Sequence, residues 1–284
     1  MSAVADFREE IVSVGNGRLD MRVRVRGSGP PLVWLHPAGG FGWSPFLEAL
    51  SQERTVYAPL VPGTSPADPN AIDEVRDLWE LILLEEETLL VLGLEGADLV
   101  GNSFGGMLAC ELQATFPGRF GKLVLLDPIG LWRDDAPVSN VLLVSPEQMP
   151  GLLFADPDGP AARAMFTPPE DPGARADAVA GLTWSMGCTA KFWWPVPDRG
   201  LGRRLHRIVA ETLVIWGADD ALVPAVYAQE FGTRITAARV EIIGNCGHVP
   251  HSERSDETLA LVAPFLGLTP QAQPSTSAET APRA

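Results

Sequence analysis

Short runs of consecutive apolar residues recur along this chain and alternate with segments long enough to form helices. The apolar runs are Pro31–Leu35, Leu99–Val100, Leu123–Leu126 and Leu213–Trp216. A strand that is apolar at every position needs both of its faces covered, as in a parallel strand between two layers of helices. Alternation of such strands with helices favours right-handed crossovers. The pattern therefore predicts an α/β fold with a mostly parallel, doubly wound sheet.

Further elements are expected between and after these strands. They are a hairpin strand at Arg22–Arg26 after the turn Gly15–Gly17, a last strand at Val240–Ile243, and helices over Ile72–Leu92, Phe104–Thr115 and Ser255–Phe265. Polar and apolar residues alternate in the hairpin strand, as expected where one face is exposed. Asn70 and Asp73 resemble a capping box, which predicts that the first helix begins beside them.

The alternation of strands and helices stops between residues 131 and 206. This segment instead carries scattered prolines and many large apolar side chains. We interpret it as a helical cap, residues 131–206, inserted into a core formed by residues 1–130 and 207–268. Residues 269–284 are low in apolar side chains, so we expect a disordered tail there.

A glycine-rich sequence, Gly101-Asn102-Ser103-Phe104-Gly105-Gly106, lies where a predicted strand ends and a helix begins. A serine on such a sharp turn projects its hydroxyl above the sheet, and glycines two residues before and after it avoid clashes. The N–H of Phe104 and the helix N-terminus then face an oxyanion that develops at a bound carbonyl group. Ser103 is therefore the candidate nucleophile.

A serine hydroxyl needs a base at neutral pH, and the chain has four histidines. His248 has the best setting, because it lies in a loop between the last predicted strand and the final helix. We expect the others, His36, His206 and His251, to be structural. Asp220 follows the strand that ends at Trp216, and a carboxylate in such a loop orients the imidazole and stabilises its charged form.

Charge and composition exclude several classes of function. The 21 Lys and Arg residues against 36 Asp and Glu residues give a net charge of −15, which argues against nucleic acid and anionic membranes as partners. Neither a metal-binding motif nor a glycine-rich phosphate loop is present, so we expect no metal and no cofactor. A small-molecule substrate is the expected partner.

Three features bear on where the protein works. The cysteines Cys110, Cys188 and Cys246 are far apart and fit neither a disulfide framework nor a zinc site, which favours a reducing compartment. The first ten residues are charged and lack the apolar core of a secretory signal. The charge-free stretch 27–47 is broken by prolines and glycines and is unsuited to a membrane helix. We therefore expect a cytoplasmic protein.

Taken together, these motifs resemble those of the α/β-hydrolase superfamily over about residues 10–268. The matching pieces are the turn His36–Gly40, the elbow Gly101–Gly105, the acid loop Gly217–Pro224, and Gly247-His248 with Glu253 after them. The resemblance implies a triad of Ser103, Asp220 and His248, with the N–H groups of Ala38 and Phe104 as the oxyanion hole. The family usually has glycine after the first histidine. Pro37 removes that donor here and makes the N–H of Gly39 a rival to that of Ala38.

The resemblance leaves two questions open. Some α/β-hydrolases carry the acid at the end of the preceding strand, where this chain has Asp127. We favour Asp220, with Asp127 as the alternative acid. A serine nucleophile indicates acyl chemistry, and we predict hydrolysis of a small, largely apolar carboxylic ester. The alternative is a carbon–carbon bond hydrolase, because the serine and histidine motifs are similar to those of ring-cleavage-product hydrolases, although Val249 replaces the tryptophan typical of that family.

Other activities share the same residues. Lactone and thioester hydrolysis need the same triad, and a non-catalytic ligand-binding protein on this fold is a further hypothesis. The predicted substrate contacts are Trp132, Trp184, Trp193 and Val249. The arginines of the cap's end, Arg199, Arg203, Arg204 and Arg207, are candidates to bind a substrate carboxylate, against the simpler interpretation of a solvated helix face.

Overall fold

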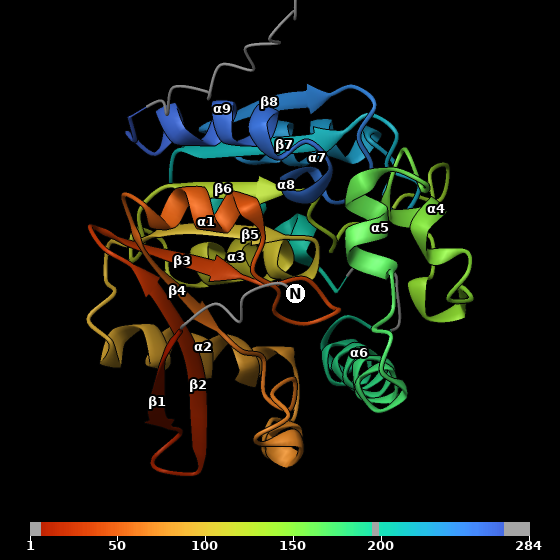
Figure 1. Cartoon of the computed structure of the whole chain (residues 1–284). Helices are drawn as coiled ribbons and strands as arrows, with labels where there is room; N and C mark the ends of the chain where they lie inside the picture. The colour runs from red at the N-terminus through yellow and green to blue at the C-terminus, as the bar shows by residue number, and fades with distance from the viewer. Residues whose placement is uncertain (1–6, 195–198, 270–284) are drawn as a thin grey trace, which may run out of the picture.

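An eight-stranded sheet forms the centre of the molecule, and a computed structural model describes it over residues 7–194 and 199–269 (Figure 1). Its strands lie in the order β1-β2-β4-β3-β5-β6-β7-β8. Their bounds are β1 Arg8–Val14, β2 Leu19–Gly27, β3 Pro31–Leu35, β4 Thr55–Pro59, β5 Asp98–Asn102, β6 Leu123–Leu126, β7 Thr212–Gly217 and β8 Ala238–Ile243. Strand β2 runs antiparallel to β1 and β4, and all pairs from β4 to β8 are parallel. The predicted hairpin and mostly parallel sheet are confirmed.

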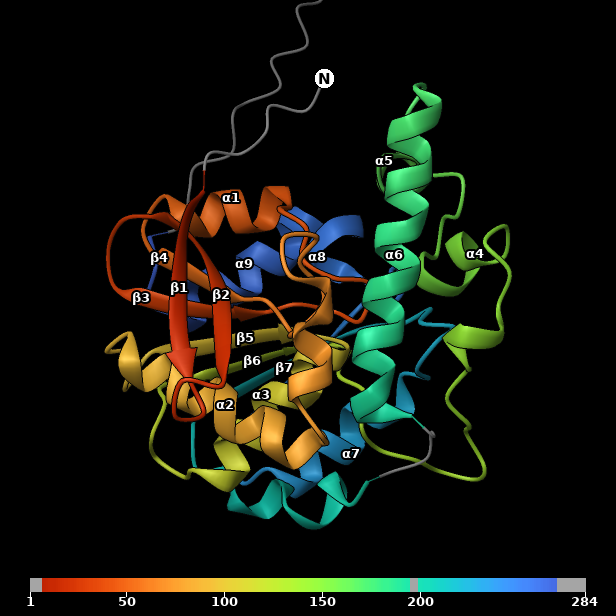
Figure 2. The ribbon, with the colours of Figure 1, turned by 90° about the horizontal axis from the view of Figure 1, so that it is seen from below.

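Helices cover both faces of the sheet, with α1, α8 and α9 above it and α2, α3 and α7 below it in Figure 2. The helices are α1 Pro45–Ser51, α2 Leu78–Val91, α3 Phe104–Thr115, α4 Met149–Leu153, α5 Pro160–Phe166, α6 Pro172–Trp193, α7 Val226–Arg234, α8 Pro250–Glu253 and α9 Ser255–Phe265. Short 3-10 helices are η1 Pro69–Glu74, η2 Val141–Leu143, η3 Leu201–Arg203 and η4 Leu205–Arg207.

The two faces of the sheet carry separate apolar cores, which explains the uninterrupted apolar strands. In β3, Val33 and Leu35 join the core beneath α2 and α3, while Leu32 and Trp34 join the core beneath α1 and α9. Successive side chains of a strand point to opposite faces, so both sets must be apolar when both faces are covered. Burial on both sides fixes the carboxyl ends of the strands, where the loops of the site begin.

The segment between β6 and β7 holds the helices α4, α5 and α6, which lie to one side of the sheet over the carboxyl ends of its strands (Figure 1). Figure 2 shows α6 as the longest of them, reaching across the end of the sheet. The helices α4, α5 and α6 lie within residues 131–206, and we keep the name cap for this segment.

Two details of the fold differ from the sequence predictions. The helix expected over Ile72–Leu92 is divided into η1 and α2, and α2 begins only at Leu78. Asp77 is its N-cap and accepts a hydrogen bond from the Glu80 N–H at 2.9 Å, which makes a better start than Asn70. Strand β4 was not predicted, because it is only five residues long and ends at Pro59, and a proline within a run argues against a strand. The expected tail, beyond Thr269, lies outside the described residues.

Two expectations about where the protein works, on membrane helices and on cysteines, can be compared with the structure. Within residues 7–194 and 199–269, none of the helices combines the length and apolarity that crossing a membrane needs. Cys110, Cys188 and Cys246 are all buried and unbonded. The prediction of a cytoplasmic location rests on the sequence alone.

Candidate active site

Ser103 lies on the sharp turn between β5 and α3. Its backbone has φ 56° and ψ −117°, a conformation that a non-glycine residue adopts only where the surroundings enforce it. A Cβ atom on Gly105 would lie 1.9 Å from the carbonyl oxygen of Leu35, and one on Gly101 would lie 2.4 Å from that of Gly105. Both flanking glycines are therefore required by close backbone packing, which holds the strained serine in place.

A chain of hydrogen bonds joins Ser103, His248 and Asp220. The Nε2 atom of His248 lies 2.8 Å from the Ser103 hydroxyl, and its Nδ1 atom lies 2.7 Å from Oδ2 of Asp220. All three side chains are buried. In this arrangement the imidazole can accept the serine proton, while the carboxylate holds the ring and stabilises the imidazolium that forms.

The two candidate acids occupy different places. Asp220 also accepts the N–H groups of Leu222 at 2.8 Å and Val223 at 2.9 Å through Oδ1, so its carboxylate is fixed on both oxygens. Asp127, at the end of β6, accepts the N–H of Gly217 at 2.8 Å instead. The structure thus places Asp220 against the imidazole and Asp127 behind it.

The backbone of the His248 loop is held by the core and by the cap. The side-chain amide of Asn102 donates to the His248 carbonyl at 3.2 Å, and the His248 N–H donates to the carbonyl of Leu153, at the end of α4, at 2.8 Å. Glu253 accepts the N–H groups of Gly247 and Asp156 at 2.6 and 3.0 Å. The position of the candidate base therefore depends on the cap as well as on the sheet.

His36 organises the turn that follows β3. Its Nε2 accepts the N–H of Val61 at 3.1 Å, which leaves Nδ1 as the donor to the Pro37 carbonyl at 2.8 Å. Burial lowers the pKa of His36 to about 4, so the ring is neutral and structural. The N–H of Ala38 takes no part in the bonds that hold this turn. Phe104, as the first residue of α3, has an N–H without a partner inside the helix.

Two further histidines, His206 and His251, form no hydrogen bond with Ser103, Asp220 or His248 among the described residues, although His251 lines the same cavity. His251 is buried beside Trp34, with ring centroids 5.3 Å apart, and burial lowers its pKa to about 3. His206 is exposed in η4. That His36, His206 and His251 are structural stays a prediction.

A cavity of about 1610 Å³ opens above Ser103 and His248, between the sheet and the cap. Trp193 and Val249, two of the predicted substrate contacts, line it. Trp132 and Trp184 do not: the indole N–H of Trp132 donates to Asp134, and that of Trp184 donates to the Pro69 carbonyl. Trp184 is 49% exposed. The expectation for these two tryptophans is corrected, because their side chains point out of the cavity.

Much of the apolar wall of the cavity was not predicted. Val179, Leu182 and Met186 of α6 line it from the cap, and Met107 lines it from the first turn of α3. The spacing of the three α6 residues follows one face of a helix, so a search for helical periodicity within the cap is the signal that finds them.

The four arginines of the cap's end have separate surroundings. Arg204 forms an ion pair with buried Glu111, with Nε 2.8 Å from Oε2, and Arg207 donates to the Ala114 carbonyl. Arg203 is exposed. Arg199 lines the cavity, and its side chain forms no ion pair with the described residues. Of the predicted carboxylate-binding cluster, only Arg199 therefore faces the site.

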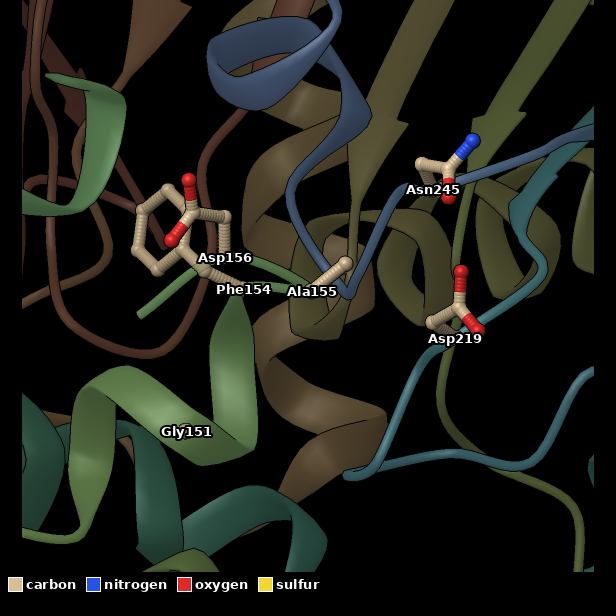
Figure 3. Close-up of a pocket in the computed structure, with 6 residues that line it drawn as sticks. All are labelled: Gly151, Phe154, Ala155, Asp156, Asp219 and Asn245. Atoms are coloured by element: carbon tan, nitrogen blue, oxygen red, sulfur yellow. The ribbon is translucent and has the colours of Figure 1, made fainter. Parts of the chain in front are cut away.

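Asp219 lies outside the site although it precedes Asp220. It lines a second, smaller pocket of about 360 Å³, together with Phe154, Asp156 and Asn245. Figure 3 shows Asp219 beside Asn245, with Phe154 and Asp156 on the opposite side. The hydrogen bond to the imidazole comes from Asp220 and not from Asp219.

A group of possible metal ligands coincides with the site. Among the described residues, one atom each of Asp127, Asp220 and His248 lie within 4.8 Å of one another. Both ring nitrogens of His248 are already engaged, by Asp220 and Ser103. The donor set therefore fits a hydrogen-bonded triad better than a metal ion.

The fold and this hydrogen-bonded site define an α/β hydrolase, and the family model agrees. The model of the alpha/beta hydrolase family matches residues 32–261, so the chain belongs to that family. A relative from Comamonas testosteroni, 2-hydroxy-6-oxo-6-phenylhexa-2,4-dienoate hydrolase, is 28% identical over 84% of this chain and 88% of its own length. A 2-hydroxy-6-oxononadienedioate/2-hydroxy-6-oxononatrienedioate hydrolase from Paraburkholderia phymatum is 28% identical over 90% and 94%.

Solved structures show the same fold in enzymes of two kinds. A meta-cleavage product hydrolase from Pseudomonas fluorescens matches with a TM-score of 0.69 and 21% identity, covering 90% of this chain and 97% of its own. A naproxen esterase from Bacillus subtilis matches with a TM-score of 0.68 and 18% identity, covering 92% of each chain. The fold is therefore shared between carbon–carbon and ester hydrolases and does not discriminate between them.

Proposed function

We propose that this protein is a serine hydrolase that cleaves a carbon–carbon bond next to a ketone in an enol-containing, carboxylate-bearing ring-fission product. The observation that carries the serine chemistry is the chain Ser103–His248–Asp220, with distances of 2.8 and 2.7 Å, at the base of the cavity. The choice of bond is supported by the relatives, whose names describe 2-hydroxy-6-oxo-dienoate hydrolases.

In the proposed reaction Ser103 attacks the ketone carbon and His248 takes its proton. The N–H groups of Phe104 and Ala38 stabilise the resulting oxyanion, and Asp220 stabilises the imidazolium. Collapse of the intermediate breaks the carbon–carbon bond, and the leaving carbon takes the electron pair and receives a proton from His248. Water then hydrolyses the acyl-enzyme by the same base. Such a leaving group needs conjugation that spreads its negative charge toward the carboxylate end.

Arg199 is the side chain that we assign to that end of the substrate. It lines the same cavity as Ser103, and a guanidinium pairs with a carboxylate through two parallel hydrogen bonds. The apolar walls of α6 then enclose the remaining part of the molecule.

Ester hydrolysis is the second candidate, and Val249 is the observation that favours it. Val249 follows the base, lies in the cavity wall and packs with Phe154 and Ala162, where ring-cleavage-product hydrolases typically have a larger tryptophan. A wide apolar cavity suits medium acyl chains, because each buried methylene contributes about 0.8 kcal/mol. On this alternative, kcat/KM rises from acetate to hexanoate esters.

A side-by-side assay distinguishes the two. The protein is given 2-hydroxy-6-oxo-6-phenylhexa-2,4-dienoate and a series of p-nitrophenyl esters, and kcat/KM is measured for each. We expect the dienoate to be the better substrate. Arg199→Ala should raise KM for the dienoate about tenfold or more and leave the esters unchanged, since only the dienoate carries a carboxylate. Arg203→Ala, which removes an exposed arginine outside the cavity, is the matched control. Turnover of hexanoate ester alone would replace the first candidate by the second.

A further inference from the structure

Asp127 is a second buried carboxyl group beside the candidate acid, and the proposed mechanism gives it no role. It follows β6 with φ 44°, in the left-handed region that aspartate and asparagine tolerate better than most residues. Its N–H donates to the Ile215 carbonyl at 3.0 Å, and its Oδ1 accepts the Gly217 N–H at 2.8 Å. Gly217 ends β7, so Asp127 joins the strand ends from which the loop of Asp220 begins.

The other oxygen of Asp127 has no hydrogen-bond partner among the described residues although it is fully buried. One oxygen of Asp127, one of Asp220 and a ring nitrogen of His248 lie within 4.8 Å of one another. Two buried carboxylates at such a separation do not both stay ionised, because each raises the free energy of the other's charge. The charge of one carboxylate therefore disfavours the charge of the other.

The hydrogen bonds decide which carboxyl group carries the charge. Asp220 accepts two backbone N–H groups and faces the Nδ1 of His248, whereas Asp127 accepts one N–H only. Burial, first, and the charge of Asp220, second, raise the pKa of Asp127 well above that of an ordinary carboxyl group. Glu253 also raises the pKa of Asp127. The thiol of Cys246 is the other titratable group nearby, and its pKa is raised by burial first and by Asp127 second.

We propose that Asp127 is a neutral carboxylic acid that donates its proton from Oδ2 to the carboxylate of Asp220, and so acts as a positioning residue behind the triad. The inference rests on the proposed serine hydrolase. A hydrogen bond from Asp127 holds the Asp220 carboxylate in the position that orients His248. It also weakens the electrostatic effect of the Asp220 charge on the imidazole. Its loss should therefore move the pH dependence of Ser103 labelling to higher pH.

Two variants separate this role from that of a catalytic acid. Asp127→Asn keeps an acceptor for the Gly217 N–H and a donor for Asp220, and should label with a fluorophosphonate at within about threefold of the wild-type rate. Asp127→Gly keeps the backbone conformation but removes the carboxyl group. It should label about ten- to a hundredfold more slowly, since a hydrogen bond to a charged group is lost. The midpoint of its pH profile should also move up by about one unit.

Asp220→Asn removes the candidate acid and is the reference variant, which should label about 10⁴-fold more slowly. Asp219→Asn, outside the site, is the control. The proposal is overturned if Asp127→Asn loses as much activity as Asp220→Asn, or if Asp127→Gly keeps the wild-type rate and pH midpoint. Infrared difference spectra of wild type against Asp127→Asn should show the band of a protonated carboxyl group, and its absence also overturns the proposal. This band tests the protonation of Asp127 even if Ser103 fails to label. Failure of Ser103 to label would contradict the proposed function and not this proposal.

Discussion

Two helices face each other across the cavity, α3 below Ser103 and α6 of the cap, and they differ in how closely they are packed. In α3 every residue from Phe104 to Ala114 is buried. In α6, 22 residues long, the buried ones lie in the second half and are Ser185, Cys188, Thr189, Phe192 and Trp193. A helix buried all round has few tolerated substitutions, whereas an exposed one has many. The difference indicates that substitutions are tolerated less well in α3 than in the first half of α6.

The largest effect is expected at Ser103, the candidate nucleophile on the core side of the cavity. Ser103→Ala removes one hydroxyl from the core side and should reduce kcat about 10⁶-fold without changing the unfolding temperature, because only the attacking atom is lost. Turnover of the dienoate and labelling by a fluorophosphonate measure the loss. Wild-type rates in the folded variant would contradict the proposed mechanism.

A pair of glycine substitutions tests the packing difference directly. Gly105→Ala should reduce the free energy of unfolding by about 4 kcal/mol or more, since the new Cβ meets the Leu35 carbonyl at 1.9 Å. Gly181→Ala in α6 meets no atom within 4 Å and should increase stability by about 0.5–1 kcal/mol, because alanine favours a helix. Denaturant unfolding measures both. Equal changes in the free energy of unfolding would contradict the difference in packing between the core helix α3 and the cap helix α6.

The last expected effect is a pH dependence of stability, and it concerns the buried Glu85 of α2. Its carboxyl oxygens are buried without a hydrogen-bond partner in the described residues, and burial raises its pKa from 4.5 to about 8. The folded state therefore favours the protonated form, so stability is greatest below the unfolded pKa and is lost as pH rises toward 8. The loss is at most about 1.4 kcal/mol per pH unit in that window.

Glu85→Gln should flatten this dependence, which thermal unfolding between about pH 5 and pH 8 would reveal. Glu95→Gln is a suitable control, because Glu95 is an exposed residue that follows α2. A slope that persists in Glu85→Gln would assign the dependence to another group.

Most of the fold was predictable because local patterns and tertiary packing agree. Runs such as Leu123–Leu126 are apolar at each position since the sheet is covered on both faces, and Phe104–Thr115 forms a helix with the predicted bounds. The start of α2 was misplaced because two capping patterns compete in the sequence, Asn70 with Asp73 and Asp77 with Glu80, and the helix begins at the second. The glycines around Ser103 identify it in the sequence, because the sharp turn that carries Ser103 requires them.

The sequence alone indicated Ser103 as the candidate nucleophile and the loop of His248 as the place of the candidate base, because a strand, a sharp turn and a helix are contiguous along the chain. Tertiary structure decided between Asp220 and Asp127, since both end neighbouring strands and only the direction of each side chain brings one of them to Nδ1 of His248. It likewise turned Trp193 into the cavity and Trp184 out of it. Side-chain direction depends on how the cap rests on the sheet, and that contact joins residues far apart in sequence.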